Sequence, residues 1–219
     1  MAPNRIEPGV FIVAPTTYEF NAVNQGLGSY LQGGEYRLLQ CGMGEEQSSA
    51  FCARLDGLSI TRLVLVGWAG GLSHDLKVGD LLYADRALHA GQPSMPCALP
   101  GTTLRCGPIL TVHAALMTPG EKQAALESGA LAVEMEAYPL AAWASRHGIP
   151  FLHGRVISDT CDETLPDVEM DTKGRPLPIA LLKRLARHPA MLGELARFGR
   201  RIQALNPLLV KLAISLASS

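Results

Sequence analysis

The sequence predicts an α/β fold in which a mostly parallel or mixed sheet is flanked by helices. Short runs rich in β-branched residues or leucine alternate with helix-like stretches up to residue 157. Several runs, such as 63–66, are apolar without alternation, as expected of strands buried on both faces. From residue 178 onward the pattern is helical only. We therefore expect a single domain over 1–219, on which 178–219 packs as a helical C-terminal extension.

The individual elements follow from composition and periodicity. Strands are expected at 10–14, 37–41, 62–66, 81–84, 109–112, 130–134 and 151–157. Helical periodicity is clearest over 137–147, where Pro139 falls in the first turn and Gly148 favours a left-handed C-terminal cap. The stretches 91–101 and 162–178 combine Gly and Pro with polar residues, and we expect both to be loops around a site.

The C-terminal extension interleaves arginines with leucine, alanine and phenylalanine. One interpretation is a pair of amphipathic helices that pack on the core or on a second subunit. The other is a basic amphipathic surface that touches a membrane or a lipid-like substrate. The last apolar stretch, 207–217, is too short to span a bilayer.

Composition argues against several classes of function. The chain has 19 basic and 20 acidic residues, so it lacks the basic surplus of a nucleic-acid partner. Its five cysteines form no C-x-x-C pair and its six histidines show no metal spacing, which predicts no metal site and a reducing, cytoplasmic location. The dinucleotide pattern that begins at Gly42 and Gly44 fails at Gln47. No cofactor is expected, although inorganic phosphate stays open as a co-substrate.

Carboxylates next to apolar strands carry the strongest chemical signal. The segment AVEMEA holds Glu134 and Glu136, and the segment RVISD runs from Arg155 to Asp159. Burying such acids without partners is costly, so they are either structural or functional. In the structural interpretation Glu136 caps the following helix and Asp159 pairs with Arg155. Spacing alone leaves both interpretations open.

Three segments in this order resemble a known superfamily. They are GWAGGLSHDLKVGDLL (67–82), AVEMEA and RVISD, and the chain resembles the nucleoside phosphorylase and methylthioadenosine nucleosidase superfamily from the first strand to about Pro166. The resemblance implies a three-layer αβα sandwich around a mixed, partly barrel-like sheet, assembled into homo-oligomers. It also implies an enzyme that cleaves the N-glycosidic bond of a purine nucleoside.

The resemblance assigns roles to residues at the matching positions. Asp159, preceded by Ser158, matches the acid that protonates the leaving purine at N7. An aspartate can also accept from a 6-amino group, so adenine is the predicted base. Glu136 matches the carboxylate that accepts from the ribose hydroxyls, and Met135 matches the residue beneath the sugar, or else packs in the core. Glu19 matches the glutamate that positions the attacking water, unless it is an exposed acid of a first helical turn.

Further candidates lie in the same motifs. Substrate-binding positions are also expected at Trp68, Ala69, Gly70, Glu134 and Ser158. Gly42 and Gly44 are expected to form the loop that approaches phosphate or water. Trp68 stands where the superfamily has a small Ser or Thr, and Ala115 stands where a nucleosidase has an aromatic ring. The resemblance therefore implies a reshaped pocket.

Within the superfamily, the chain looks most similar to the hopanoid-associated phosphorylase branch. The resemblance rests on a short 113–130 segment, the stretch 158–166, the element from Asp171 to Gly174 and the arginine-rich tail. It implies release of adenine from adenosylhopane, with phosphate or water as acceptor, and leaves peripheral membrane contact open. Two alternatives are a methylthioadenosine or adenosylhomocysteine nucleosidase and a nucleoside-binding protein without turnover.

Overall fold

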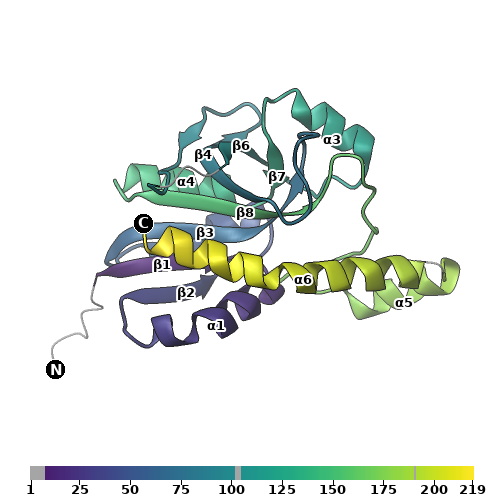
Figure 1. Ribbon diagram of the computed structural model, residues 1–219, viewed down its shortest axis with the longest axis horizontal. Coiled ribbons are helices and arrows are strands. Elements are labelled where there is room, and N and C mark those ends of the chain that lie inside the picture. Colours follow the sequence, from purple (N-terminus) through teal and green to yellow (C-terminus); the bar gives the residue numbers. More distant parts are fainter. Residues whose placement is uncertain (1–7, 102–104, 190) are drawn as a thin grey trace.

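The structure is a computed structural model that describes residues 8–101, 105–189 and 191–219 (Figure 1). Strands and helices alternate as the sequence predicts. In chain order they are β1 (Gly9–Ala14), α1 (Thr17–Leu31), β2 (Tyr36–Gln40), α2 (Glu45–Leu55), β3 (Ile60–Gly71), β4 (Leu81–His89), β5 (Met95–Pro96), β6 (Cys106–Thr111), α3 (Pro119–Leu126), β7 (Ala132–Glu134), α4 (Ala137–Arg146), β8 (Phe151–Asp159), α5 (Pro178–Arg187) and α6 (Met191–Ala217).

The sheet is mixed and partly closed. β2, β1 and β3 run parallel, and β3 continues the sheet by parallel pairing with β8. β8 pairs antiparallel with β4, β4 pairs parallel with β6, β6 pairs parallel with β7, and β7 returns antiparallel to β3. These pairings close a ring through β3, β8, β4, β6 and β7. The predicted partly barrel-like sheet is therefore confirmed.

Helices cover both faces of this sheet. Alternate side chains of β1 enter different cores because successive strand residues point to opposite faces. Phe11 and Val13 pack in a core that also holds side chains of α2 and α4. Val10 and Ile12 pack in a second core with side chains of α1 and α6. The result is the predicted three-layer αβα sandwich, in which each buried leucine or valine contributes about 1.5–3 kcal/mol.

Three features differ from the sequence prediction, and the first is β4, which runs to His89 instead of ending near residue 84. β3 continues through Gly71 instead of ending near residue 66, and a short strand, β5, lies inside the expected 91–101 loop. The end of β3 is rich in glycine because side chains of the neighbouring strand β8 occupy the space that Cβ atoms would need. A Cβ on Gly67 would lie 2.1 Å from Arg155 Nη1, and one on Gly70 would lie 3.1 Å from Asp159 Oδ2. Strand pairing there overrides the loop signal that clustered glycines normally carry.

The helical extension divides into a packed half and a projecting half. From Leu205 onward α6 buries one face against α1 and β8, which confirms core packing for that half. Its N-terminal half and α5 extend beyond the edge of the sheet (Figure 1). Among the described residues, no helix combines the length and apolarity needed to cross a bilayer.

Candidate active site

A cavity of about 230 Å³ opens at the carboxyl ends of β3, β7 and β8. In α/β folds this edge of the sheet is where ligands usually bind. The cavity is lined by all nine residues predicted to be catalytic or substrate-binding: Glu19, Trp68, Ala69, Gly70, Glu134, Met135, Glu136, Ser158 and Asp159. The nine residues come from α1, β3, β7 with the turn that follows it, and β8, so segments far apart in the sequence converge on one site.

Asp159 is the last residue of β8, and its side chain is almost fully buried. Ser158 Oγ donates a hydrogen bond of 2.5 Å to Asp159 Oδ1. Lys122 Nζ donates to the other carboxylate oxygen, Oδ2, at 2.6 Å. The pairing with Arg155 that spacing left open is not formed. The charge partner of Asp159 is instead a lysine from α3.

Lys122 is a functional candidate that sequence reasoning missed. The side chain is completely buried, and its three donors go to Asp159 Oδ2, Thr160 O at 2.7 Å and Glu163 O at 3.0 Å. A lysine is rarely buried this deeply without an acidic partner. The sequence of this segment does contain one recognisable motif, the Thr118-x-x-Glu121 capping box that starts α3, and Lys122 is the buried residue that follows it. Nothing in the sequence connects that helix to Asp159.

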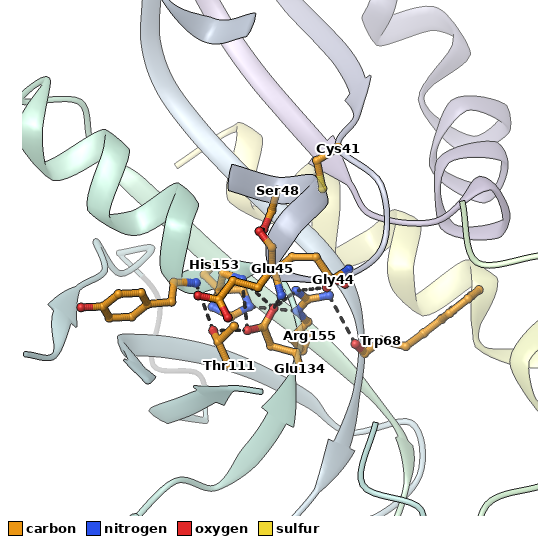
Figure 2. Close-up of polar contacts among 12 residues, drawn as sticks. Cys41, Gly44, Glu45, Ser48, Trp68, Thr111, Glu134, His153 and Arg155 are labelled. Atoms are coloured by element: carbon orange, nitrogen blue, oxygen red, sulfur yellow. Dashed lines mark hydrogen bonds and ion pairs between the residues drawn. The ribbon is translucent and has the colours of Figure 1, made fainter. Parts of the chain in front are cut away.

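Arg155 does not line the cavity but forms ion pairs with two carboxylates that do (Figure 2). It forms ion pairs with Glu134 and, at 3.3 Å, with Glu136, and its Nη1 donates to the Trp68 carbonyl. Its Nε donates at 2.9 Å to Nε2 of His153, so that ring is an acceptor and neutral. Burial and the neighbouring guanidinium hold the pKa of His153 well below its usual value.

Glu134, and not Glu136, caps α4. Its carboxylate accepts from the backbone N–H groups of Glu136 and Ala137, from Thr111 Oγ1 and from Arg155 (Figure 2). Glu136 occupies the N-cap position but makes no side-chain cap. The interpretation in which Glu136 caps this helix through its side chain is therefore wrong. These groups use the hydrogen-bonding capacity of Glu134, and the contacts hold Arg155 and the start of α4 in place.

Glu136 is the more available carboxylate. Its Oε1 accepts at 2.8 Å from the Gly44 backbone N–H, and its Oε2 faces Arg155. Burial raises the pKa of Glu136 to about 8, with Glu134 adding to the rise and Arg155 opposing it. Gly42 and Gly44 have φ of 92° and 91°, which suits glycine, and this loop reaches the site through Glu136. A group that donates to Glu136 would favour its ionised form.

Glu19 is buried, so it is not the exposed helix acid that one interpretation proposed. It is nevertheless the capping-box residue of α1, because Oε2 accepts from Thr16 N at 2.8 Å and Thr16 Oγ1 at 2.7 Å. Its Oε1 accepts from Trp68 N at 2.7 Å. A carboxylate offers about four lone-pair sites, so one is left to face the cavity.

A second, apolar groove of about 480 Å³ adjoins the cavity. The two share lining residues, namely Thr16, Met43, Trp68, Ser158 and Phe198. The rest of the groove is lined largely by apolar side chains of α5, α6 and the preceding loop, including Val168, Leu181, Leu195 and Ile202. Trp68 stands at the junction, and Figure 2 shows its ring directed away from the Arg155 network. Within the described residues, its buried Nε1 has no hydrogen-bond partner.

A turn from Asp171 to Gly174 closes over the Gly42 loop. Asp171 Oδ1 accepts from the backbone of Lys173 and Arg175, and Gly174 has φ of 72°. Backbone bonds tie the turn to both neighbours, from Thr17 N to Lys173 O and from Met43 N to Thr172 O. A Cβ on Gly174 would lie 2.5 Å from Thr16 Cγ2, so only glycine fits. This element of the sequence thus belongs to the wall of the site.

Comparison with solved structures shows the same fold. Campylobacter jejuni 5′-methylthioadenosine/S-adenosylhomocysteine nucleosidase aligns with a TM-score of 0.69 and 16% identity, covering 96% of this chain and 99% of that one. The Helicobacter pylori enzyme of the same name, complexed with a pyrrolidine-containing ligand, gives 0.65 and 16%, covering 97% and 95%. Futalosine hydrolase of Helicobacter pylori gives 0.62 and 17%, covering 92% and 99%. None of the curated proteins matches this chain.

The sequence also matches a family profile. That profile, described as the phosphorylase superfamily, matches residues 18–99 and 95–187. The matched region covers well over half of the chain and contains every candidate residue of the cavity. The chain therefore belongs to the phosphorylase superfamily of enzymes.

Proposed function

We propose that this enzyme releases adenine from an adenosine that carries a large apolar 5′ substituent, with adenosylhopane as the candidate substrate. The observation that supports the proposal is the apolar groove, which is continuous with the cavity that holds Glu19, Glu136 and Asp159. At about 480 Å³ the groove alone falls within the usual range for a small-molecule site, about 300–1,000 Å³.

The chemistry follows from the carboxylates. Breaking the C1′–N9 bond leaves an oxocarbenium-like ribose, and adenine departs more easily once N7 has taken a proton. Asp159 is proposed to pass that proton to N7, and the Lys122 ammonium, which donates to Asp159 Oδ2, is proposed to supply it to the carboxylate. Glu136, held by the Gly44 N–H, is proposed to accept from the ribose hydroxyls. Met135 and Gly70 line the space for the nucleoside.

The acceptor is proposed to be water. The free lone pair of Glu19 can take the proton that water loses as its oxygen bonds to C1′. Phosphate is disfavoured because the described residues lining the cavity include no arginine or lysine. Trp68 also reduces the space for phosphate, because it stands where the superfamily has a small residue.

The main alternative is a methylthioadenosine or adenosylhomocysteine nucleosidase. It is favoured by the structural neighbours, two of which bear that name. The groove argues against it, because a methylthio group would leave most of that apolar surface uncovered. A binding protein without turnover has no use for an acid and a nucleophile-side carboxylate in one cavity.

A substrate series tests the proposal. Adenine release is measured by chromatography from methylthioadenosine and from an adenosine with a long apolar 5′ substituent, each with and without phosphate. We expect kcat/KM to be at least tenfold higher for the apolar substrate, with no dependence on phosphate. Faster cleavage of methylthioadenosine would establish the ordinary nucleosidase, and phosphate dependence would refute water as the acceptor.

We also propose that the projecting helices rest on an anionic membrane surface, from which an apolar substrate would enter the groove. Three large apolar side chains are strongly exposed there: Ile179 (72%), Leu182 (71%) and Leu192 (61%). The segment 178–201 carries six Lys or Arg residues and one Glu, whereas the whole chain has a net charge of −1. Apolar side chains flanked by basic ones are typical of helices that lie in a membrane interface.

Sedimentation with lipid vesicles tests this surface. We expect binding to vesicles that contain anionic lipid and weak binding to neutral ones, because the charge on 178–201 adds to apolar burial. The double variant Ile179→Ser, Leu182→Ser should lose most of the vesicle binding. The control variant Leu99→Ser changes an exposed leucine outside the C-terminal extension and should bind as the parent chain does. If the double variant instead changes the oligomeric state in gel filtration, the surface is a contact between copies of this chain.

We further propose that the chain forms a homo-oligomer and is located in the cytoplasm.

A further inference from the structure

Three metal-ligating side chains meet outside the nucleoside cavity. Glu45 Oε2 lies 2.7 Å from His113 Nδ1 and 3.2 Å from His89 Nε2. All three ligand atoms lie within 4.8 Å of one another. Two imidazoles and one carboxylate form a ligand set that zinc and related ions use widely. None of the three side chains lines the cavity or takes part in the proposed reaction.

The fold, and not local spacing, brings these residues together. Glu45 is the first residue of α2, His89 is the last residue of β4, and His113 follows β6. The parallel pairing of β4 with β6 sets His89 opposite Thr111, so the chain presents His113 just beyond that strand end. The spacing of the histidines along the sequence predicts no metal site, because that spacing does not register residues that come from separate elements.

The ring of His89 is held in one orientation. Its Nδ1 lies 3.1 Å from the Ala90 carbonyl, and the ring of Tyr138 packs against it at 5.1 Å between centroids. A carbonyl oxygen can only accept, so Nδ1 carries the hydrogen. The opposite nitrogen, Nε2, then faces a carboxylate oxygen, which is also only an acceptor. Either a proton on Nε2 or a metal ion therefore lies between them, and a carbonyl-held imidazole is the usual outer-shell support of a metal ligand.

We propose that Glu45, His89 and His113 bind one divalent transition-metal ion of the zinc class. Protons on His89 Nε2 and His113 Nδ1 could each donate to Glu45, whereas a metal ion would bind all three ligand atoms at once. With Zn–N and Zn–O bonds of about 2.0–2.1 Å, ligand atoms in a tetrahedral site lie about 3.3 Å apart. The separation of 3.2 Å between Glu45 and His89 lies near this value, and the 2.7 Å between Glu45 and His113 would have to widen on binding. The side chain of His113 is 78% exposed, so solvent can supply the fourth ligand.

Such an ion would brace the loop that faces the active site. Glu45 directly follows Gly44, whose N–H donates to Glu136. The ion would join the start of α2 to the ends of β4 and β6. The inference stands independently of the proposed reaction, because it concerns binding and stability.

A second cluster must be distinguished in the test. Cys161 Sγ lies 3.2 Å from His74 Nδ1, and Asp162 lies 3.8 Å from the same nitrogen. The side chains of His74 and Asp162 are largely exposed, and no carbonyl orients the histidine through its other nitrogen among the described contacts. A thiolate ligand would give cobalt an intense near-ultraviolet charge-transfer band, which nitrogen and oxygen ligands lack.

Cobalt provides the probe. The chelator-treated full chain is titrated with Co²⁺, and we expect one equivalent to give a visible ligand-field spectrum without a thiolate band. Adding Zn²⁺ should displace the cobalt and raise the Tm, since an ion that binds only the folded state stabilises it. His89→Ala and His113→Ala should each weaken cobalt binding at least tenfold. His188→Ala, at an exposed histidine of the C-terminal extension, is the matched control.

Several results would overturn the site. They are no binding of Co²⁺ or Zn²⁺, binding that is unchanged in both histidine variants, or a thiolate band that disappears in Cys161→Ser. His113 is exposed, so His113→Ala is expected to fold and to report on binding even if His89→Ala perturbs the packing against Tyr138.

Discussion

An Asp159→Asn variant is expected to lose about 10²–10⁴-fold in kcat for adenine release, while still binding the nucleoside. The amide keeps the shape of the side chain and can still accept the hydrogen bond from Ser158, but it has no acidic proton to give to N7. Turnover is measured by adenine release, and binding is measured by calorimetry with the same substrate. A separation of the two effects would mark Asp159 as the proton donor.

The control for this variant is Asp162→Asn, three residues further along, where the carboxylate is 78% exposed. It should leave kcat unchanged. Because Asp159→Asn also removes the partner of Lys122, both proteins must be compared at a temperature where unfolding curves show them folded. Equal turnover of the Asp159→Asn variant and the parent chain would remove Asp159 from its proposed role.

Replacing Lys122 by Met is expected to lower the free energy of unfolding by about 3–5 kcal/mol, the usual effect of breaking a buried ion pair. The substitution leaves the Asp159 carboxylate without its charge partner and leaves the carbonyls of Thr160 and Glu163 without a donor. It also detaches α3 from the loop after β8. The change is measured as a shift of the urea midpoint at pH 7.

The matched control is Lys77→Met, because Lys77 is exposed and should tolerate the same change within about 0.5 kcal/mol. If both lysine variants unfold at the same urea concentration, the contact of Lys122 with Asp159 is worth little. A kcat that also falls in the Lys122→Met protein while KM stays constant would show that the lysine supports the acid as well as the fold.

Much of the fold was readable because it depends on local pattern. The apolar runs that became β1, β2, β6 and β8 could be placed, as could α4, where Gly148 takes φ of 63° after the last turn. The extent of β3 could not, because the glycines from 67 to 71 read as a turn. Their place in a strand depends on the bulk of Arg155 and Asp159 on the neighbouring strand, which only pairing reveals.

The site was predictable where one motif carried its own chemistry. Glu136, Asp159 and Glu19 were named from their segments, and all three line one cavity. Their partners were not predictable, because spacing left open whether Asp159 pairs with Arg155 and whether Glu136 caps α4. Glu134 and Glu136 are only two residues apart, and nothing in the sequence shows which of the two carboxylates caps the helix. Only the position of Arg155 and the direction of α4 decide that Glu134 takes the capping role.

By itself, the sequence determined the order of strands and helices and the superfamily, and through that resemblance it proposed the acids, since each of these is encoded in contiguous residues. The tertiary structure alone decided which cation faces Asp159, how the cavity continues into an apolar groove, and that Glu45, His89 and His113 meet. These features join residues from elements far apart in the chain. Their distances are set by strand pairing and helix packing, which no local pattern of residues specifies.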